Sequence, residues 1–500
     1  MSLTLTLYGA SPEEVMADAY FRADYVALHA RPDPIDTLER PGFRHAAAVR
    51  TIPGTDAEDM ETPWGYGGPV ARDEAAFWEG IGLWRQRQRD HGRIAEFVRL
   101  HPFLNPLGYR GWFDQLRFDR LTVLVDLSVD PALRRRAYSK GTRYSLRQAE
   151  RLLTVRALEP GEAALFRRCY EEGLGRNSAE RSYYFPADYY ARLLEAPYAT
   201  AWVVEREGRA VAVACFLSGG PFAHYHLSGG GAAARTGFAH YLLLEHAIEH
   251  YRARGCRFMH LGGGRSAAPD DDLLKFKRRF SSWLIPFYTG GLVYDRAAYD
   301  RLTQGRRHRF LSYRFGPPEE PARDDVSLDP ATPGDLAIFF RIKCDIDNIV
   351  WSGHARPPLW PEMAAWYAPH MAGGTGRRIF IARSGRRTVG YAYLDEAGER
   401  LAVTIGLAAG EGGRGRGRAL LSALVKQVER EGDARPLEAW IFPENLPTVH
   451  AFEAVGFVRD PSRAPKPSAM PLLGREPRGQ HCWVRSAASG AAAASEARAG

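Results

Sequence analysis

A short run of glycine and arginine is the segment of this chain whose residue types most clearly suggest chemistry. It consists of Gly412, Gly413, Arg414, Gly415, Arg416 and Gly417. Glycines let a backbone turn sharply and approach a ligand closely. The amides of a helix that begins here, at the positive end of its dipole, suit a pyrophosphate, and the two arginines add charge for phosphates. The loop alone is a weak signal, because a flexible surface turn has a similar composition.

The residues around this loop predict the elements that must position it. Val403, Ile405 and Leu407 alternate as in a strand that runs into the loop. The helix after the loop has a buried face marked by three-and-four spacing of Leu420, Leu421, Leu424, Val425 and Val428. From about residue 325 to residue 460, the predicted order is strand, helix, hairpin, strand, loop, helix, strand, helix and strand.

A second motif follows in segment 443–457, which contains Asn445 and ends in Gly456-Phe457. With the glycine loop, this segment resembles the GNAT acetyltransferase superfamily, whose loop motif Gln/Arg-x-x-Gly-x-Gly/Ala precedes an Asn and a helix that ends in Gly-Phe. The resemblance implies that two central strands splay apart and hold acetyl-CoA, or another acyl-CoA, in the gap. The pantetheine arm would pair with the strand that ends at Leu407, the pyrophosphate would bind segment 412–417, and Asn445 would help hold the cofactor. The alternative for Asn445 is a helix N-cap.

The chain departs from the family pattern at two positions. Gly412 stands where the family usually has Arg or Gln. Phe452 stands where many members have a tyrosine that protonates the departing CoA thiolate, so that step must use water or another group.

Transfer of an acyl group to an amine also needs a base, or a water path, that takes the ammonium proton. Glu438, on the predicted strand 437–442, is the first candidate, because it resembles a base of some family members. Glu411 and His354 are alternatives. Residues of these types are more often surface or structural residues.

An altered copy of this pattern lies earlier in the chain. A shift of 180 residues superimposes Leu227 on Leu407, Gly230 on Gly410, Gly237 on Gly417, Ala239 on Ala419, Leu244 on Leu424 and Glu249 on Glu429. Segment 232–237, opposite the glycine loop, has a single glycine. The earlier copy is therefore not expected to hold CoA in the same way.

Segments 222–230, 258–264 and 274–280 resemble the FemAB/FemX family of peptidyltransferases, which are double GNAT folds that use aminoacyl-tRNA. Lys277 matches a lysine of the family's Phe-Lys-x-x-Phe motif that is linked to transfer, where an ammonium would stabilise an oxyanion or a tRNA phosphate. The alternative is a solvated lysine of a basic helix. The histidines of these segments lack a carboxylate or cysteine cluster, so no metal is expected.

The expected fold class is α/β (α+β), with three GNAT-like folds on mixed central sheets, the first two paired as in FemAB-like proteins. The expected domains are two GNAT-like halves at 1–150 and 151–316, a linker at 317–325, a GNAT acyltransferase domain at 326–461, and a disordered tail at 462–500. The tail ends in Ala-, Ser- and Gly-rich sequence that cannot bury a core.

Composition and charge limit the possible functions less sharply than the motifs do. The net charge of +8 comes almost entirely from arginine. One explanation is codon bias of the genome toward arginine, and the other is affinity for a phosphate-bearing partner such as CoA, a nucleotide sugar or tRNA. The five cysteines are odd in number and far apart, which favours a reducing cytoplasm. No stretch is long and apolar enough for a membrane span, and the N-terminus does not have the pattern of a signal peptide.

The leading hypothesis is a bacterial N-acyltransferase that moves an acyl group, in the first place acetyl, from acyl-CoA to an amine. The amine would belong to a small molecule or peptide of envelope, polysaccharide or natural-product biosynthesis, and no DNA partner is expected. One alternative is a FemAB-like transferase dependent on aminoacyl-tRNA, whose product the C-terminal domain acetylates. A second is a GNAT-fold binding protein that has lost catalysis.

Overall fold

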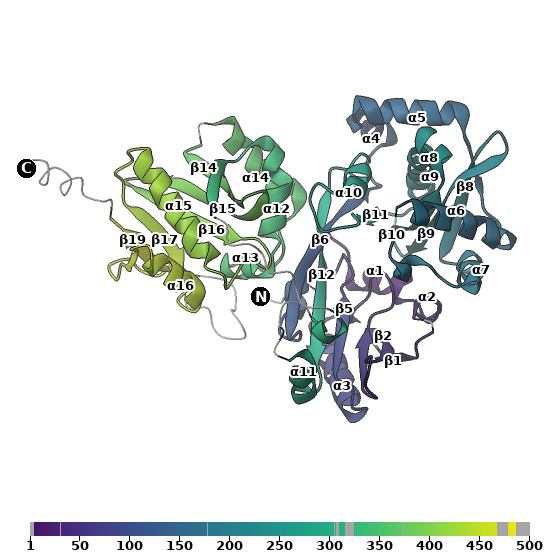
Figure 1. The fold of residues 1–500 in the computed structure, drawn as a ribbon, viewed down its shortest axis with the longest axis horizontal. Helices are drawn as coiled ribbons and strands as arrows, with labels where there is room; N and C mark the ends of the chain where they lie inside the picture. The colour runs from purple at the N-terminus through teal and green to yellow at the C-terminus, as the bar shows by residue number, and fades with distance from the viewer. Residues whose placement is uncertain are drawn as a thin grey trace, which may run out of the picture. The chain divides into compact units, whose positions relative to one another are not determined.

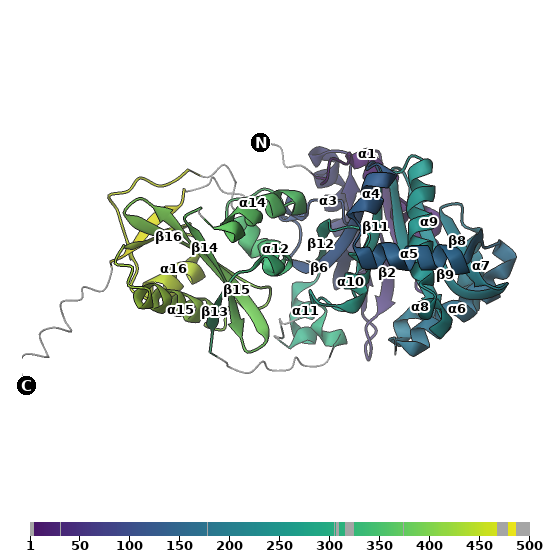
Figure 2. The ribbon, with the colours of Figure 1, turned by 90° about the horizontal axis from the view of Figure 1, so that it is seen from above.

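The computed structural model describes residues 5–30, 32–177, 179–304, 306, 310–315, 325–373, 375–467 and 479–486. Apart from residue 325, the predicted linker at 317–325 lies outside these ranges. The chain divides into two compact units, Met1–Pro317 and Pro318–Gly500. Each unit is described by itself (Figures 1 and 2).

The N-terminal unit contains eleven α-helices and twelve strands within its described residues. Its helices are α1 (Pro12–Met16), α2 (Ala23–His29), α3 (Glu74–Asp90), α4 (Pro131–Ala137), α5 (Lys140–Leu152), α6 (Ala163–Arg176), α7 (Ala187–Glu195), α8 (Ala232–Thr236), α9 (Ala239–Ala253), α10 (Asp272–Lys277) and α11 (Arg296–Thr303). Its strands are β1 (Ile35–Arg40), β2 (Phe43–Thr51), β3 (Glu58–Glu61), β4 (Val70–Ala71), β5 (Ala95–Arg99), β6 (Gln115–Asp126), β7 (Thr154–Ala157), β8 (Ala199–Arg206), β9 (Arg209–Gly219), β10 (Phe222–Gly230), β11 (Phe258–Gly263) and β12 (Leu284–Val293).

These strands form one sheet in the order β1-β2-β3-β5-β12-β6-β11-β10-β9-β8-β7, with β4 beside β2. The pattern of an antiparallel run followed by a parallel pair occurs twice. In the first half β3 and β5 are parallel and are joined through α3, and in the second half β10 and β11 are parallel and are joined through α8 and α9. The sheet continues across the predicted division at residue 150, because β6 pairs with both β11 and β12.

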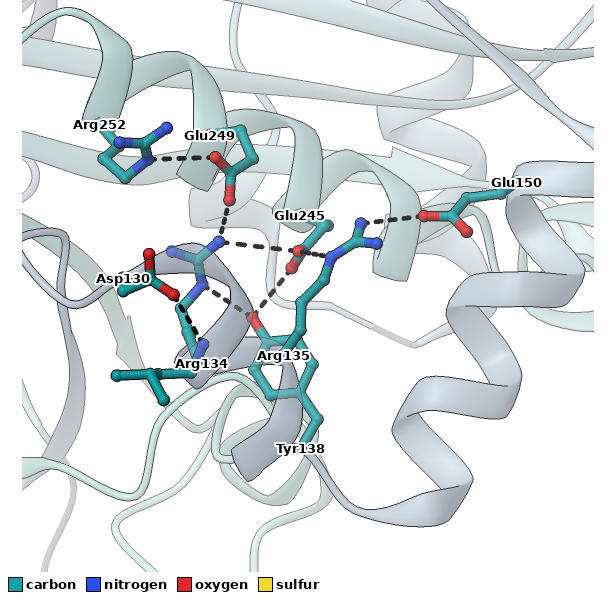
Figure 3. A network of polar contacts seen from close by, with 9 residues as sticks. Asp130, Arg134, Arg135, Tyr138, Glu150, Glu245, Glu249 and Arg252 are labelled. Carbon is teal, nitrogen blue, oxygen red and sulfur yellow. Dashed lines mark hydrogen bonds and ion pairs between the residues drawn. The ribbon is translucent and has the colours of Figure 1, made fainter.

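A network of ion pairs attaches α4 to α9 (Figure 3). The Arg134 guanidinium bonds to Glu249, and the Arg135 Nε donates to Glu245 Oε1 at 2.6 Å. The hydroxyl of Tyr138 donates to the other Glu245 oxygen at 2.9 Å. Arg134 and Glu245 are both buried, so this network satisfies charges that would be costly if unpaired.

The C-terminal unit contains a second mixed sheet, in the order β13-β14-β15-β16-β17-β19-β18. Its strands are β13 (Ser327–Pro330), β14 (Arg377–Ser384), β15 (Arg387–Ala397), β16 (Arg400–Leu407), β17 (Leu437–Ile441), β18 (Val458–Arg459) and β19 (His481–Arg485). Its helices are α12 (Leu336–Lys343), α13 (Ile346–Trp351), α14 (Trp360–Ala372), α15 (Arg416–Arg430) and α16 (Leu446–Glu453). The order up to residue 460 agrees with the predicted elements, except that three helices, α12, α13 and α14, stand where one was predicted.

Helices cover both faces of this sheet (Figure 2). The leucine and valine face predicted for the helix after the glycine loop is buried in α15, against Val403 and Leu437 of the sheet. On the other face, Phe339 of α12 and Tyr367 of α14 pack against Ile379 and Tyr391. Antiparallel strands lead to a parallel pair, β16 and β17, joined through α15, so the arrangement occurs a third time. The three predicted folds and their mixed sheets are therefore present.

The prediction of a disordered tail from residue 462 is wrong for residues 481–485. They form β19, which pairs with β17 and β18 and buries Cys482 and Trp483. This strand is only five residues long, and the biased amino-acid composition of the flanking sequence concealed it. Segments 468–478 and 487–500 of the predicted tail lie outside the described residues.

No helix in the described part of the chain is long and apolar enough to cross a membrane.

Candidate active site

The central strands of the C-terminal sheet separate after a short paired stretch. β16 and β17 pair in parallel at Leu401 with Leu437 and at Ala402 with Glu438, and β16 then continues to Leu407. All five residues of β17 pair with β19 on the other side. Glu438 therefore lies at the apex where the two strands begin to diverge.

The glycine loop joins the open end of β16 to α15. Gly413 and Gly415 have φ values of +73° and +74°, which side chains rarely adopt. A Cβ atom built on Gly412, Gly413 or Gly415 meets nothing within 4 Å, so the loop backbone borders open space. Gly415 is the N-cap of α15 and provides no side-chain cap for the first amides of the helix. This geometry suits an anion at the helix start.

The two loop arginines have different surroundings. Arg414 is exposed, so its guanidinium can reach a phosphate at the loop. Arg416 is buried and donates to the Ser384 hydroxyl at 2.9 Å, and its Nε lies 3.8 Å from a Glu411 oxygen. Arg416 therefore supports the loop from inside, while its backbone belongs to the first turn of α15.

Asn445 has the geometry of a helix N-cap. Its side-chain oxygen accepts from the Thr448 amide at 3.4 Å at the start of α16, and the residue is 8% exposed. The capping alternative is therefore present in the structure, and a contact with the cofactor stays a prediction.

Replacing Asn445 with Ala separates these two roles. We expect a loss of about 1 kcal/mol in the free energy of unfolding, because an N-cap side chain contributes about that much. Denaturant titration with and without CoA measures the effect. Equal loss in both series indicates capping alone, and a larger loss with CoA indicates contact with the cofactor. Asn445→Asp, which preserves the cap oxygen, is the matched control.

The three candidate bases lie in different environments. Glu438 is buried, accepts from the Trp440 indole at 3.2 Å, and has Arg400 and Arg463 at 3.6 and 3.9 Å. The two arginines balance the negative charge of the carboxylate, and the indole hydrogen bond fixes its position.

Glu411 is also buried and is ion-paired with Arg387 as well as Arg416, so it acts as an anchor for the loop. His354 is exposed, and its pKa is lowered by partial desolvation and by the nearby charges of Lys343 and Arg356. A lowered pKa leaves its imidazole neutral at neutral pH, as a base requires.

Sequence reasoning missed two residues of α12 and α13 near this site. The Lys343 ammonium lies over the rings of Tyr391 and Tyr393, at 4.7 and 5.3 Å, and burial lowers its pKa. The side-chain amide of Asn348 donates to the backbone carbonyl of Leu407 at 2.8 Å and so attaches α13 to the open end of β16. The sequence did contain a signal for Lys343, because a lysine four residues after an apolar Phe339 lies on the same, inward side of a helix.

The N-terminal unit has a comparable divergence between β10 and β11. Their last paired residues are His224 and His260, which correspond to Ala402 and Glu438 at a shift of 178 residues. The glycine loop has no counterpart here, because α8 occupies residues 232–236 and a Cβ on Gly229 would contact the backbone of Tyr170 at 2.3 Å. The expectation that the earlier copy does not hold CoA in the same way stays a prediction.

Lys277 lies on α10 beside this divergence and is 7% exposed, so it is not a solvated lysine. Its ammonium donates to the Gly263 carbonyl of β11 at 2.7 Å and lies 5.6 Å from the centre of the Tyr225 ring of β10. Burial, assisted by the charge of Arg120, lowers its pKa to about 7. A perturbed lysine at this position is a candidate functional group.

Asp18, His101 and His224 form a buried group near the same strands, with ligand atoms that lie within 4.8 Å of one another. The His224 Nε2 hydrogen-bonds to Asp18 at 2.7 Å, while His101 Nε2 lies 3.6 Å from the same oxygen. The Phe103 amide donates to His101 Nδ1 at 3.4 Å, which favours the tautomer with its proton on Nε2, toward Asp18. Burial by itself raises the pKa of Asp18, but the charges and hydrogen bonds of the two histidines have the larger effect, so the net pKa is lowered. The sequence had not indicated this carboxylate, which meets the two histidines only in the tertiary structure.

Comparison with protein-family models gives two matches. Residues 134–278 match an acetyltransferase (GNAT) domain, and residues 345–457 match the acetyltransferase (GNAT) family. Comparison with curated proteins gives no significant match.

Solved structures with related folds include FemX, at 9% identity and a TM-score of 0.47, covering 60% of this chain and 99% of that one. The C-terminal DUF2156 domain of a putative lysylphosphatidylglycerol synthetase from Agrobacterium fabrum has 17% identity and a TM-score of 0.41, covering 59% and 93%. The aminoglycoside acetyltransferase AAC(6')-Ib, solved with ribostamycin and coenzyme A, has 22% identity and a TM-score of 0.28, covering 33% and 94%.

The sheet topology and the two family matches define the class of this chain. It contains GNAT acetyltransferase domains, matched at residues 134–278 and 345–457, and their arrangement of antiparallel strands leading to a parallel pair occurs once more in the first half of the N-terminal unit.

Proposed function

We propose that the C-terminal unit transfers an acyl group, in the first place acetyl, from acyl-CoA to a primary amine of a small molecule or peptide. The observation that carries this proposal is the open glycine loop at the start of α15, beside the diverging strands β16 and β17. The pyrophosphate of CoA binds the loop backbone and Arg414, and the pantetheine arm follows the end of β16 at Leu407. Amino sugars and peptides of envelope, polysaccharide or natural-product biosynthesis are the acceptor classes that we propose.

The amine nitrogen attacks the thioester carbonyl, the new C–N bond forms, and the C–S bond breaks. The proton of the amine passes to a base, for which we propose Glu438 at the strand apex. The CoA thiolate then leaves and takes its proton from water, because the buried Phe452 cannot donate one.

Titration of the full chain with acetyl-CoA, followed by thiol release with a panel of amines, tests this proposal. Saturable binding with amine-dependent release supports it. Absence of binding contradicts it, and binding without turnover for every amine favours the binding-protein alternative.

Glu438→Gln tests the base. We expect a 10²–10⁴-fold lower kcat with retained acetyl-CoA affinity, because general bases contribute about that much. His354→Gln is the parallel variant, and a fall of this size there, with unchanged kcat in Glu438→Gln, would assign the base to His354.

A second function is favoured by the buried ammonium of Lys277 beside the divergence of β10 and β11. We propose that the N-terminal unit forms an amide with an amino acid from aminoacyl-tRNA, as the FemAB/FemX resemblance implies. Release of labelled amino acid that depends on an acceptor and is lost in Lys277→Met supports this function. Unchanged release in that variant contradicts it.

We also propose a cytoplasmic location. The five cysteines are free, as they are in a reducing compartment. Alkylation of the purified protein under native and denaturing conditions checks their thiol state.

A further inference from the structure

The segment that contains the helices α4 and α5 is dense in positive charge. Residues 130–152 contain seven basic and two acidic side chains, which is a net +5, against +8 for all 500 residues. Figure 1 shows α5 along the outer edge of the N-terminal unit.

Three of these basic side chains are used to hold the helices in place. Arg134 and Arg135 belong to the network with Glu245 and Glu249 of α9 (Figure 3). Arg143 folds back and donates to the backbone carbonyl of Arg136 at 2.8 Å. These contacts fix α4 and the start of α5 against the unit.

The outward face of α5 is a different set, formed by Lys140, Tyr144, Arg147 and Arg151, which are all exposed. Their spacing of four, three and four residues places them on one side of the helix, in a row about 16 Å long. The buried residues Thr142, Ser145, Leu146 and Ala149 lie on the opposite side. Among the described residues, no carboxylate forms an ion pair with Lys140, Arg147 or Arg151, whereas Glu150 pairs with Arg135.

Apolar side chains are also exposed on α4 and α5. Leu133 on α4 is 58% exposed, Leu152 at the end of α5 is 48% exposed, and Tyr144 within the row is 53% exposed. A helix at a lipid–water boundary combines such apolar side chains with cations.

We propose that the outward face of α5 docks the protein on an anionic lipid bilayer. A straight helix at the edge of a unit lets all three cations contact a flat surface at once. Anionic headgroups supply the missing counter-charges, and Leu133, Leu152 and Tyr144 enter the headgroup region. A nucleic acid also offers phosphates, but the two leucines have no partner on a phosphate backbone, so the surface fits lipid better.

Sedimentation of the full chain with vesicles tests this docking. We expect binding to vesicles of phosphatidylcholine mixed with phosphatidylglycerol, no binding to phosphatidylcholine alone, and release at high salt. Lys140→Gln, Arg147→Gln and Arg151→Gln together should weaken partition about 100-fold, because each basic residue near an anionic surface contributes about a factor of five.

The control removes the same charge elsewhere in the unit, with Arg206→Gln, Arg209→Gln and Arg254→Gln, which are exposed positions. This control should retain vesicle binding. Equal loss in both triple variants shows an effect of net charge and overturns the proposal, as does unchanged binding in the α5 variant. Absence of vesicle binding together with transfer RNA binding that the α5 variant loses assigns the face to nucleic acid and also overturns it. Circular dichroism of each variant establishes that it is folded.

Discussion

Gly415→Val should weaken binding of acetyl-CoA to the full chain about 300-fold, because it removes about two charge-assisted hydrogen bonds to the pyrophosphate. Gly415 caps α15 with a φ of +74°, and a β-branched residue avoids that conformation. The backbone must rotate to accommodate valine, which turns the first amides of α15 away from the ligand. Isothermal titration with acetyl-CoA and with CoA measures the loss.

Gly432→Val is a closely matched control. Gly432 follows the other end of α15, has a φ of +71°, and like Gly415 has nothing within 4 Å of an added Cβ. Its substitution carries the same backbone strain but is far from the helix N-terminus. We expect similar unfolding temperatures for the two variants and unchanged acetyl-CoA affinity for Gly432→Val. Wild-type affinity in Gly415→Val would exclude the loop as the pyrophosphate site.

Lys277→Met should stabilise the protein at pH 7 and remove a pH dependence of its unfolding. Burial lowers the pKa of Lys277 to about 7 in the folded chain, whereas an unfolded lysine titrates near pH 10. Between these values the unfolded chain binds the additional proton, so the free energy of unfolding rises as pH rises through this window. The full rise is on the order of 4 kcal/mol. Methionine has no proton to bind, so the variant lacks this rise.

Denaturant unfolding of wild type and Lys277→Met at several values between pH 6 and pH 10 measures the difference. The stabilisation should be largest at the low end and should shrink toward pH 10. Lys275→Met, at an exposed lysine of the same helix, should keep the wild-type dependence. A wild-type rise that persists in Lys277→Met would show that another group causes it. Greater stability combined with loss of amino acid transfer would indicate that the ammonium is retained for function.

Local patterns in the sequence predicted the strands and the glycine loop of the C-terminal unit up to residue 460, together with α15 and α16, but one helix where α12, α13 and α14 stand. The reason is that the elements around segment 412–417 are set by nearby residues: alternation in β16, three-and-four spacing in α15, and glycine where φ is positive. The internal repeat likewise indicated β10, α9 and β11. These features depend on backbone preference and on one buried face for each element.

Tertiary structure decided how these elements combine and which side chains meet. The single sheet of the N-terminal unit depends on β12 lying between β5 and β6, a pairing of residues distant in the sequence. The short strand β19 is stabilised by β17 and β18 rather than by its own propensity. Asp18 meets His224, which is distant in the sequence. Arg416 turns inward to Ser384, although Arg414 and Arg416 both stand between glycines in the loop. Contacts of this kind arise from packing between distant segments, which composition and periodicity do not encode.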